Sequence, residues 1–199
     1  MSCTIPDLYK SVSHCAGSVI LPGVRPFAYA IQKANIVSWP TIPAEVKTAM
    51  GELVTLTGSF TLAADKKFIK IDLVDGKSSV EFSSQGEYPS KSFLNKANLV
   101  IPGTGADAEG FCAAANHDSL IYLVPDRQGK YRVIGNEMFD TNSKPEGKTG
   151  ASATDEHSTT IAVEVNDATP PAYYEGDIVT DDGTIDASTG KIKTATAGG

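Results

Sequence analysis

The chain has 199 residues, of which 41% are hydrophobic and 21% charged, the composition of one folded domain with a core of its own. Its formal net charge of −7 argues against a protein that holds nucleic acid through its phosphates, because such a protein needs clustered lysine and arginine. No apolar run approaches the roughly 20 residues of a membrane span. Asp7, Lys10 and His14 interrupt any secretory signal at the N-terminus, so we expect a protein made in a cytoplasm, with no membrane partner.

The strands are predicted from alternation of apolar and polar side chains. Residues 1–25 show little periodicity and are expected to form an arm that becomes ordered against another subunit. In GELVTLTGSFTL, residues 51–62, alternation predicts one half-buried strand with a bulge or bend at Gly58. Further strands are predicted in the same way at residues 66–75, 78–84, 92–103, 119–126, 130–135, 158–165 and 176–180.

Short connections determine the predicted fold class. Residues 63–67 and 74–79 are turn-like, so the strands that they join are predicted to be antiparallel neighbours, since a parallel crossover needs a dozen residues or more. PDRQGK, residues 125–130, predicts a tight hairpin. Only residues 105–116 place apolar side chains at helical spacing. The predicted fold is mostly β: an antiparallel β-sandwich or barrel-like pair of sheets with one flanking α-helix at about 105–116.

Residues 99–126 also suggest a nucleotide-binding unit. The stretch 103–108 fits a loose G-x-G-x-x-A, and Asp126 stands where a ribose-binding acid is expected. Two features argue against that function. A dinucleotide fold needs several βαβ units, whereas one helix is predicted here among about eight strands. Asp107 and Glu109 occupy the helix N-terminus, where they would repel a pyrophosphate. We interpret the stretch as a strand-to-helix corner.

Two segments beyond the arm lack periodicity. Residues 139–157 are polar and rich in Gly, Pro, Ser and Thr, and a compact domain seldom keeps so long a loop without a use. We predict that this loop is mobile or contacts a partner. Residues 181–199 predict a weak hairpin and a small-residue tail. The predicted organisation is an N-terminal arm at 1–25, a β domain at 26–180 that carries the long loop, and a C-terminal extension at 181–199.

The candidate subunit-contact residues lie in the long loop and in a pair of tyrosines after PPA. The tyrosine pair is either exposed for assembly or the start of a half-buried strand. The candidates are Lys144, Pro145, Glu146, Lys148, Tyr173 and Tyr174.

No catalytic, metal-binding or cofactor-binding residues are predicted. The chain has no G-x-S-x-G motif, and its three histidines have no recognisable partner pattern. The clusters at 155–157 and 181–182 fit loop solvation better than a metal site, because consecutive residues of an extended chain point in opposite directions. Cys3, Cys15 and Cys112 have no metal-ligand spacing, and we expect free thiols, with a Cys3–Cys15 disulfide as the alternative.

The order of strands and turns resembles one family of structural proteins. The stretches that carry this resemblance are residues 17–43, 58–103, 106–116, 119–137, 153–165 and 171–178. Together they are similar to tail tube (major tail) proteins of tailed bacteriophages, particularly of phages that infect Bacteroidetes. The resemblance implies a virion protein without catalytic residues, which forms hexameric rings that stack into a tube. Its implied partners are other copies, other phage tail or connector proteins, and genomic DNA that passes without specific binding.

The acidic composition and the predicted edge strands agree with a tail tube protein. Two other functions, a connector or decoration protein and a carbohydrate-binding module, remain as alternatives. An acidic lining repels DNA phosphates, and edge strands can pair between subunits to close a ring. A head-tail connector or capsid decoration protein has a related β fold and an equally plain sequence. A carbohydrate-binding β-sandwich module would need exposed aromatics on a concave face, and the one tryptophan, Trp39 beside Pro40, is expected instead to plug one end of the core.

Overall fold

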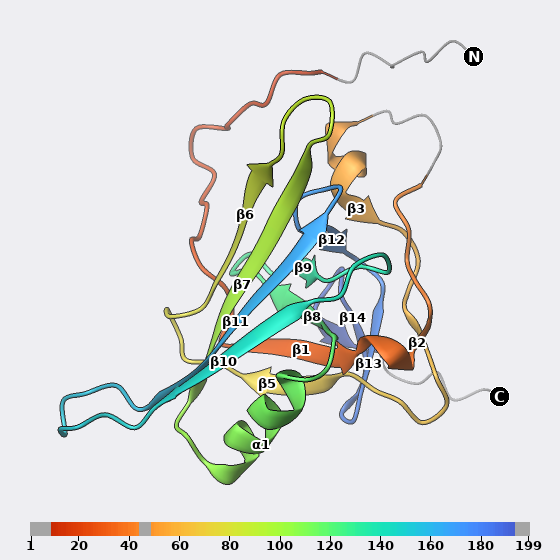
Figure 1. Ribbon diagram of the computed structural model, residues 1–199. Helices are drawn as coiled ribbons and strands as arrows, with labels where there is room; N and C mark the ends of the chain where they lie inside the picture. Colours follow the sequence, from red (N-terminus) through yellow and green to blue (C-terminus); the bar gives the residue numbers. More distant parts are fainter. Residues whose placement is uncertain (1–8, 44–48, 194–199) are drawn as a thin grey trace.

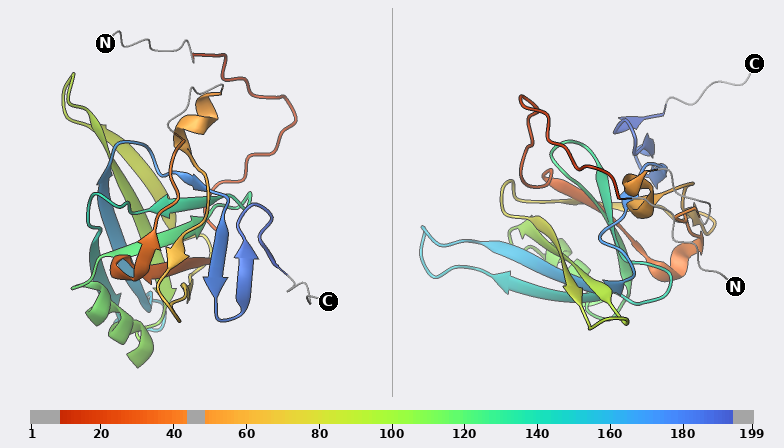
Figure 2. Two further views of the ribbon diagram at one scale, coloured as in Figure 1. Left: turned by 90° about the vertical axis from the view of Figure 1, so that its right-hand side faces the viewer. Right: turned by 90° about the horizontal axis from the view of Figure 1, so that it is seen from above.

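Strand β8 (Leu120–Pro125) is buried along its whole length and lies in the middle of the fold. The computed structural model describes residues 9–43 and 49–193 and places layers of strands on both faces of the sheet that contains β8 (Figure 1, Figure 2). The protein is mostly β, with 44% strand and 10% helix over the part of the chain that the structure describes. Its sheets are antiparallel and sandwich-like, and none closes into a barrel within the described residues, so the predicted fold class is confirmed.

Four sheets make up three layers. The middle layer has the strand order β3 (Thr55–Leu56), β12 (Tyr173–Tyr174), β9 (Tyr131–Ile134), β8, β1 (Phe27–Gln32) and β5 (Ile69–Asp72). Its neighbours are antiparallel except β12 and β3, which are parallel. The second layer is an antiparallel sheet in the order β10 (Asn142–Lys148), β11 (Ser158–Asp167), β7 (Ser92–Pro102) and β6 (Ser79–Gln85). The third layer contains β13 (Asp177–Thr180), β14 (Gly183–Asp186) and β15 (Lys191–Ile192), with the pair β2 (Ile36–Ser38) and β4 (Thr61–Leu62).

The two faces of β8 belong to two separate cores. Tyr122 and Val124 face the four-stranded sheet and pack in one cluster with Leu99 and Ile161. Each fully buried side chain of this size stabilises the fold by about 1.5–3 kcal/mol. One helix, α1 (Ala106–Ala115), covers the end of this cluster with Phe111, as the helical spacing predicted.

The second core lies between the six-stranded sheet and the third layer. Ile121 and Leu123 of β8 pack there with Phe60 and Phe68. Trp39 packs edge-to-face on Phe60, with 5.5 Å between the ring centroids, so it plugs this core as expected. The C-terminal strands β14 and β15 also pair as predicted, and residues 194–199 lie outside the described part of the chain.

The strand predicted at residues 51–62 is wrong. The chain instead forms the 3-10 helix η2 (Met50–Val54), then β3, a loop, and β4, which belongs to another sheet. Gly58 lies in the loop with φ +90°, a conformation that favours glycine, and this turn separates the two strands.

Two short connections do not join hydrogen-bonded neighbours, contrary to the prediction. β4 pairs with β2 and β5 with β1, so residues 63–68 cross from one sheet to another. Residues 73–78 likewise lead from β5 to β6 in the four-stranded sheet. By contrast, the predicted hairpin at residues 125–130 is confirmed, and Asp126 accepts the Lys130 backbone N–H at 2.9 Å.

Three elements, β10, β1 and the 3-10 helix η1 (Lys33–Asn35), lie where the sequence predicted no regular structure. β10 occupies residues 142–148 of the segment predicted as a loop at 139–157, so this segment contains one strand of a long hairpin and its irregular connection to β11. The central strand β1, followed by η1, was not predicted. Within the described residues, no helix has the length and apolar character needed to span a membrane.

Candidate subunit-contact surface

Four of the candidate contact residues lie on β10, which is an edge strand of the four-stranded sheet. The β10–β11 hairpin projects beyond the rest of the molecule (Figure 1). Pro145 is tolerated because an edge strand has one side without a pairing neighbour. Lys144, Glu146 and Lys148 are exposed. This edge therefore presents charged side chains beside backbone groups that a further strand could pair with.

The two candidate tyrosines do not form an exposed pair. Tyr174 is only 1% exposed; its hydroxyl accepts the Phe60 N–H at 3.2 Å and donates to the Asp177 carbonyl at 2.7 Å. Tyr173 points to the opposite face of β12, as alternation along a strand requires. Its ring lies 4.0 Å from the Arg132 guanidinium carbon, and its hydroxyl accepts an N–H from that group at 2.6 Å. Tyr174 is therefore a core residue, and Tyr173 borders a surface cleft.

One face of the four-stranded sheet packs in the core and the other carries charged side chains. The strand register places six of these on the outer face, which we call the polar sheet face. It carries three glutamates and three lysines, so it is balanced in charge and the acidic lining expected from composition is not found on it. The six residues are Glu81, Lys96, Lys144, Glu146, Lys148 and Glu164.

Glu164 lies at the centre of this face, between two lysines. Its carboxylate oxygens are 2.7 Å from Lys144 Nζ and 3.2 Å from Lys96 Nζ. The hydrogen bond from Lys144, followed by that from Lys96, lowers the pKa of Glu164 below its usual value. Both lysine charges are therefore engaged within the sheet, which leaves them less free to hold a phosphate.

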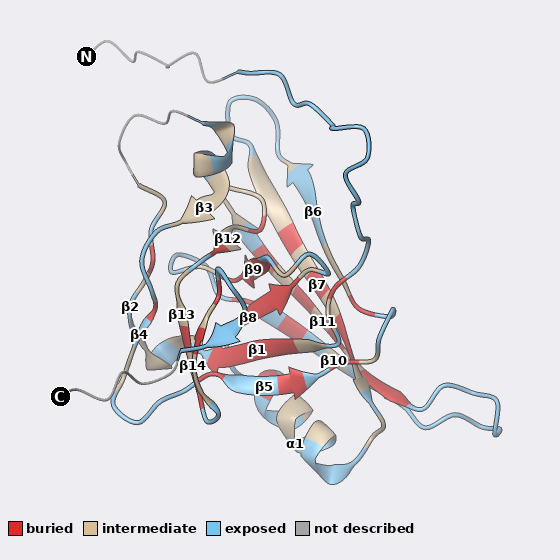
Figure 3. Cartoon of the chain, turned by 180° about the vertical axis from the view of Figure 1, so that it is seen from behind, coloured by how far each residue is buried: buried red, intermediate tan, exposed pale blue. Residues whose placement is uncertain are grey.

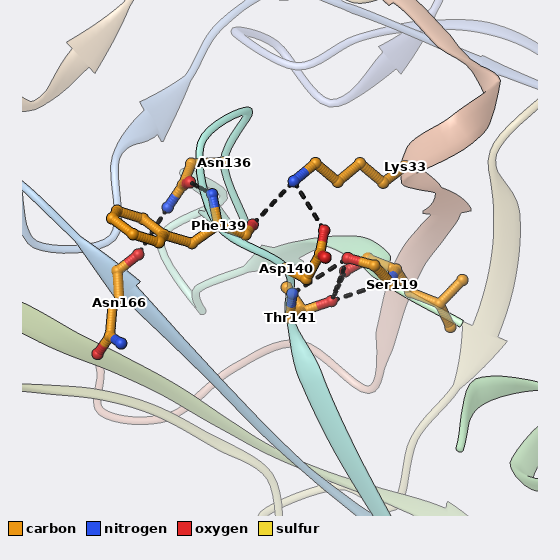
Figure 4. Close-up of polar contacts among 8 residues, drawn as sticks. Lys33, Ser119, Asn136, Phe139, Asp140, Thr141 and Asn166 are labelled. Atoms are coloured by element: carbon orange, nitrogen blue, oxygen red, sulfur yellow. Dashed lines mark hydrogen bonds and ion pairs between the residues drawn. The ribbon is translucent and has the colours of Figure 1, made fainter. Parts of the chain in front are cut away.

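The loop at 136–140 is held in one conformation by a polar network (Figure 4). Lys33 Nζ donates to the Phe139 carbonyl at 3.0 Å and to Asp140 Oδ1 at 2.9 Å. Asn136 accepts the Phe139 N–H at 2.8 Å, while its amide donates to the Asn166 carbonyl at 2.8 Å. The Lys33 hydrogen bond also lowers the pKa of Asp140. A loop fixed in this way presents its side chains in a defined direction.

The projecting parts of the chain are exposed (Figure 3), and several of them carry large apolar side chains. In the arm, Tyr9 and Val12 are each 91% exposed. Tyr88 is 90% exposed at the tip of the β6–β7 hairpin, and Met138 is 82% exposed on the loop at 136–140. Single exposed apolar side chains are common on protein surfaces, so their exposure alone does not assign a partner to them.

A groove of about 470 Å³ between α1 and β10 brings Cys112 and His117 together with Pro145 and Glu146. Burial, and then the nearby charge of Glu109, raises the pKa of the Cys112 thiol. A nucleophilic cysteine needs the opposite shift, because the thiolate is the reactive form. The groove therefore resembles a packing recess beside the edge strand more than a catalytic site.

The acidic clusters noted in the sequence have structural partners. Asp155 accepts the backbone N–H groups of Ala151 and Ser152, both at 2.8 Å, and these bonds lower its pKa. Across residues 9–43 and 49–193, no three His, Cys, Asp or Glu side chains gather as metal ligands. Cys15 and Cys112 are free thiols, and Cys3 lies outside the described residues.

Sequence reasoning did not identify Lys96, Glu164 or Arg132 as parts of a surface site. Lys96 and Glu164 meet only through the pairing of β7 with β11. Arg132 had one available signal, since it is the single charged residue inside the apolar strand β9. A cation in such a strand points either to a partner or to a ligand.

Comparison of the chain with protein families, with curated proteins and with solved structures gives no match.

Proposed function

We propose that this chain is a structural virion protein: a tail tube subunit that forms stacked rings around a channel for phage DNA. The observation that carries the proposal is the four-stranded sheet. One of its faces closes a core, its other face is polar and uncovered, and both of its edge strands, β6 and β10, lack a neighbour among the described residues. The unpaired backbone groups of such edge strands can pair with a strand of another copy.

The two edge strands match each other in length, since β6 and β10 each have seven residues. Pairing β10 of one copy with β6 of the next buries both edges in a contact between two different surfaces. A contact of this type closes into a ring when its rotation divides a full turn, and otherwise produces a helix. The resulting ring would present the polar sheet face of every copy toward the same side.

A ring lined by the polar sheet face suits a channel through which DNA slides. Lys96 and Lys144 are held by Glu164, so the face offers few free cations to phosphate. Non-specific DNA binding depends on lysine and arginine releasing the counterions of DNA. A charge-balanced lining therefore lets the polyanion pass without tight contacts, while the net charge of −7 opposes adhesion elsewhere.

The projecting parts supply contacts between copies in this proposal. We expect residues 139–157 and the two terminal segments to become protected from hydrogen exchange on assembly, because the β10–β11 hairpin and the described part of the arm, residues 9–22, extend from the body of the subunit (Figure 1). Hydrogen exchange of the dispersed and the assembled protein tests this expectation. Equal exchange of these segments in both states would contradict it.

The first experiment is negative-stain microscopy of the purified protein at rising concentration, with native mass measured on the same sample. Stacked rings or tubes support the tail tube function. Single rings that never stack indicate the alternative of a connector or decoration protein. A monomer at every concentration contradicts self-assembly by the chain alone.

A matched pair of variants tests the edge-strand contact. Lys148→Glu reverses a charge on the exposed edge β10, and Lys66→Glu makes the same change in a loop between β4 and β5. We expect only Lys148→Glu to raise the concentration needed for assembly, because it reverses a charge in the proposed contact between β10 and β6, and β6 carries the acidic Glu81. Equal assembly of both variants would contradict pairing through β10.

A further inference from the structure

The sandwich is open at the β6 end, where a cleft of about 430 Å³ lies beside the first core. Val80 faces that core, and Phe82, two residues further along β6, points to the same side of the sheet. Phe82 nevertheless remains 54% exposed. Ile20 and Leu21 of the arm border the same cleft. The apolar space between the sheets is therefore incompletely filled at this end.

Arg132 supplies the polar anchor of this inter-sheet cleft. It shares a face of β9 with buried Ile134, so it points between the sheets, where its guanidinium stacks on Tyr173. Its neutral partners are the Tyr173 hydroxyl at 2.6 Å and the Pro171 carbonyl at 3.5 Å, and no carboxylate of the described residues pairs with it. A guanidinium has five N–H donors, so donors remain for an incoming anion.

A buried polar atom on the same inner side of the four-stranded sheet also lacks a partner. Asn95 is paired in register with Phe82 on the inner side of the four-stranded sheet and is fully buried. Its amide N–H donates to the Thr169 carbonyl at 3.0 Å, whereas its oxygen has no hydrogen-bond partner among the described residues. Buried acceptors normally accept a hydrogen bond. This end of the sandwich therefore has both an unpaired hydrogen-bond acceptor and an incompletely buried apolar side chain.

The chain itself carries a group with the complementary chemistry at the tip of the β6–β7 hairpin. The tip turns tightly, with the Ser90 N–H donating to the Glu87 carbonyl at 2.7 Å, and it exposes Glu87 next to Tyr88. The other exposed aromatics fit less well. Tyr9 is followed by Lys10, and the acid beside Phe139 is already held by Lys33.

We propose that the hairpin tip of one copy docks in the inter-sheet cleft of another, a contact that rests on the self-assembly proposed above. The Glu87 carboxylate pairs with the Arg132 guanidinium, and the Tyr88 ring fills the space beside Phe82 and the apolar arm residues. A planar guanidinium and a carboxylate form a bidentate pair, which fixes orientation as well as charge. Aromatic anchors in such pockets commonly dominate the affinity of an interface.

The geometry makes this contact intermolecular. β6 continues for three residues beyond Phe82 to Gln85, so a strand rise of about 3.3 Å per residue places the end of the strand about 10 Å from Phe82, and the tip with Tyr88 lies beyond that end (Figure 1). Tip and cleft are different surfaces, and each copy carries both. Such a contact propagates from copy to copy, as ring formation or stacking requires.

Disulfide trapping between full-length copies tests the contact. Cys3, Cys15 and Cys112 are first replaced by Ser, Ser and Ala, so that each variant carries one thiol. Ser90→Cys marks the tip and leaves Glu87 and Tyr88 intact, while Gln128→Cys marks the exposed rim of the cleft. One partner carries a size tag, so mixed dimers separate from the others after oxidation.

We expect mixed Ser90→Cys and Gln128→Cys dimers to form at least five-fold more than dimers of Ser90→Cys with the control Lys66→Cys. Adding Glu87→Arg to the tip partner should remove the excess, and adding Arg132→Glu to the cleft partner should restore it. Glu87 is exposed, so the first change tests the contact even where Arg132→Glu impairs folding. Thermal unfolding of each variant confirms that it is folded.

Microscopy of the same mixtures separates this inference from the proposed function. Tubes without excess cross-linking overturn the docking of the tip and leave the tail tube function standing. Excess cross-linking without tubes supports the docking while contradicting tube formation. Neither cross-linking nor tubes overturns both.

Discussion

The hydroxyl oxygens of Tyr122 and Ser143 lie 3.0 Å apart in the interior between the two larger sheets. Tyr122 belongs to the central strand β8 and Ser143 to the edge strand β10, so this contact joins the projecting hairpin to the body of the fold. Both residues are buried, and each hydroxyl satisfies the other where water cannot. The position of the edge strand thus depends on a polar pair inside an otherwise apolar core.

Tyr122→Phe should lower the free energy of unfolding by about 1–2 kcal/mol, because it leaves the Ser143 hydroxyl buried without its partner. Urea unfolding of the wild type and the variant measures the change. Ser143→Ala and the double variant complete the cycle, and we expect the double variant to be more stable than the sum of the single changes predicts. Additive effects would show that the two hydroxyls do not stabilise each other.

Stability should fall between pH 10 and pH 12. Burial raises the pKa of Tyr122 to about 12 and that of Tyr131 to about 12, against an ordinary value of 10.0. Over this range the unfolded chain releases phenolic protons that the folded protein retains, so unfolding becomes more favourable as pH rises. The stabilisation that these protonated tyrosines provide is complete below pH 10. It is lost as the pH rises towards their pKa values of about 12 in the folded protein.

The urea midpoint at pH 9, 10, 11 and 12 measures this dependence. Tyr122→Phe should reduce the slope without abolishing it, because one tyrosine with a raised pKa no longer titrates while Tyr29, Tyr131 and Tyr174, whose pKa values are also raised, still do. A slope equal to that of the wild type would contradict the assignment to Tyr122.

The strands that could be predicted from the sequence are those with one solvent-exposed face and one buried face. β7 and β11 have buried and more exposed residues in alternation, and both were predicted. β1 was not predicted, because Ala28 through Ile31 are buried on both faces and leave no period of two. β10 was missed for the opposite reason, since most of its side chains are exposed and pairing with β11 alone makes it a strand.

Long-range register explains why the candidate surface was only partly predicted. The charged residues of β10 were identified from composition, but Glu164 and Lys96 join them through strands far apart in the sequence. The short connections before and after β5, residues 63–68 and 73–78, could likewise be only partly interpreted from the sequence. Their length excludes a parallel crossover, yet it does not distinguish a hairpin from a step between two sheets.

Gly135→Ala should destabilise the protein by about 2–6 kcal/mol. Gly135 has φ +127°, and an added Cβ would collide with Ile121 Cδ1 and lie 3.2 Å from Thr141 Cγ2. Backbone strain and overpacking each contribute about 1–3 kcal/mol at such a site. Gly76→Ala is the control, because Gly76 has φ +75° with open space around its Cβ position, so it carries the strain alone. Equal urea midpoints for the two variants would contradict the packing argument.

Glu164→Gln should increase non-specific DNA binding if the polar sheet face is the channel lining. The change removes the carboxylate that holds Lys96 and Lys144, so two lysines become available to phosphate. Fluorescence anisotropy of a labelled duplex, measured with assembled protein at several salt concentrations, should show tighter binding at low salt. The slope of log affinity against log salt should steepen by about one to two.

Glu137→Gln is the matched control for this experiment, because it removes the same charge from the loop at 136–140, away from the polar sheet face. Binding that increases equally in both variants would reflect net charge alone. An increase confined to Glu164→Gln would connect the ion pairs of the polar sheet face with the passage of DNA, because only that variant releases cations on the proposed lining.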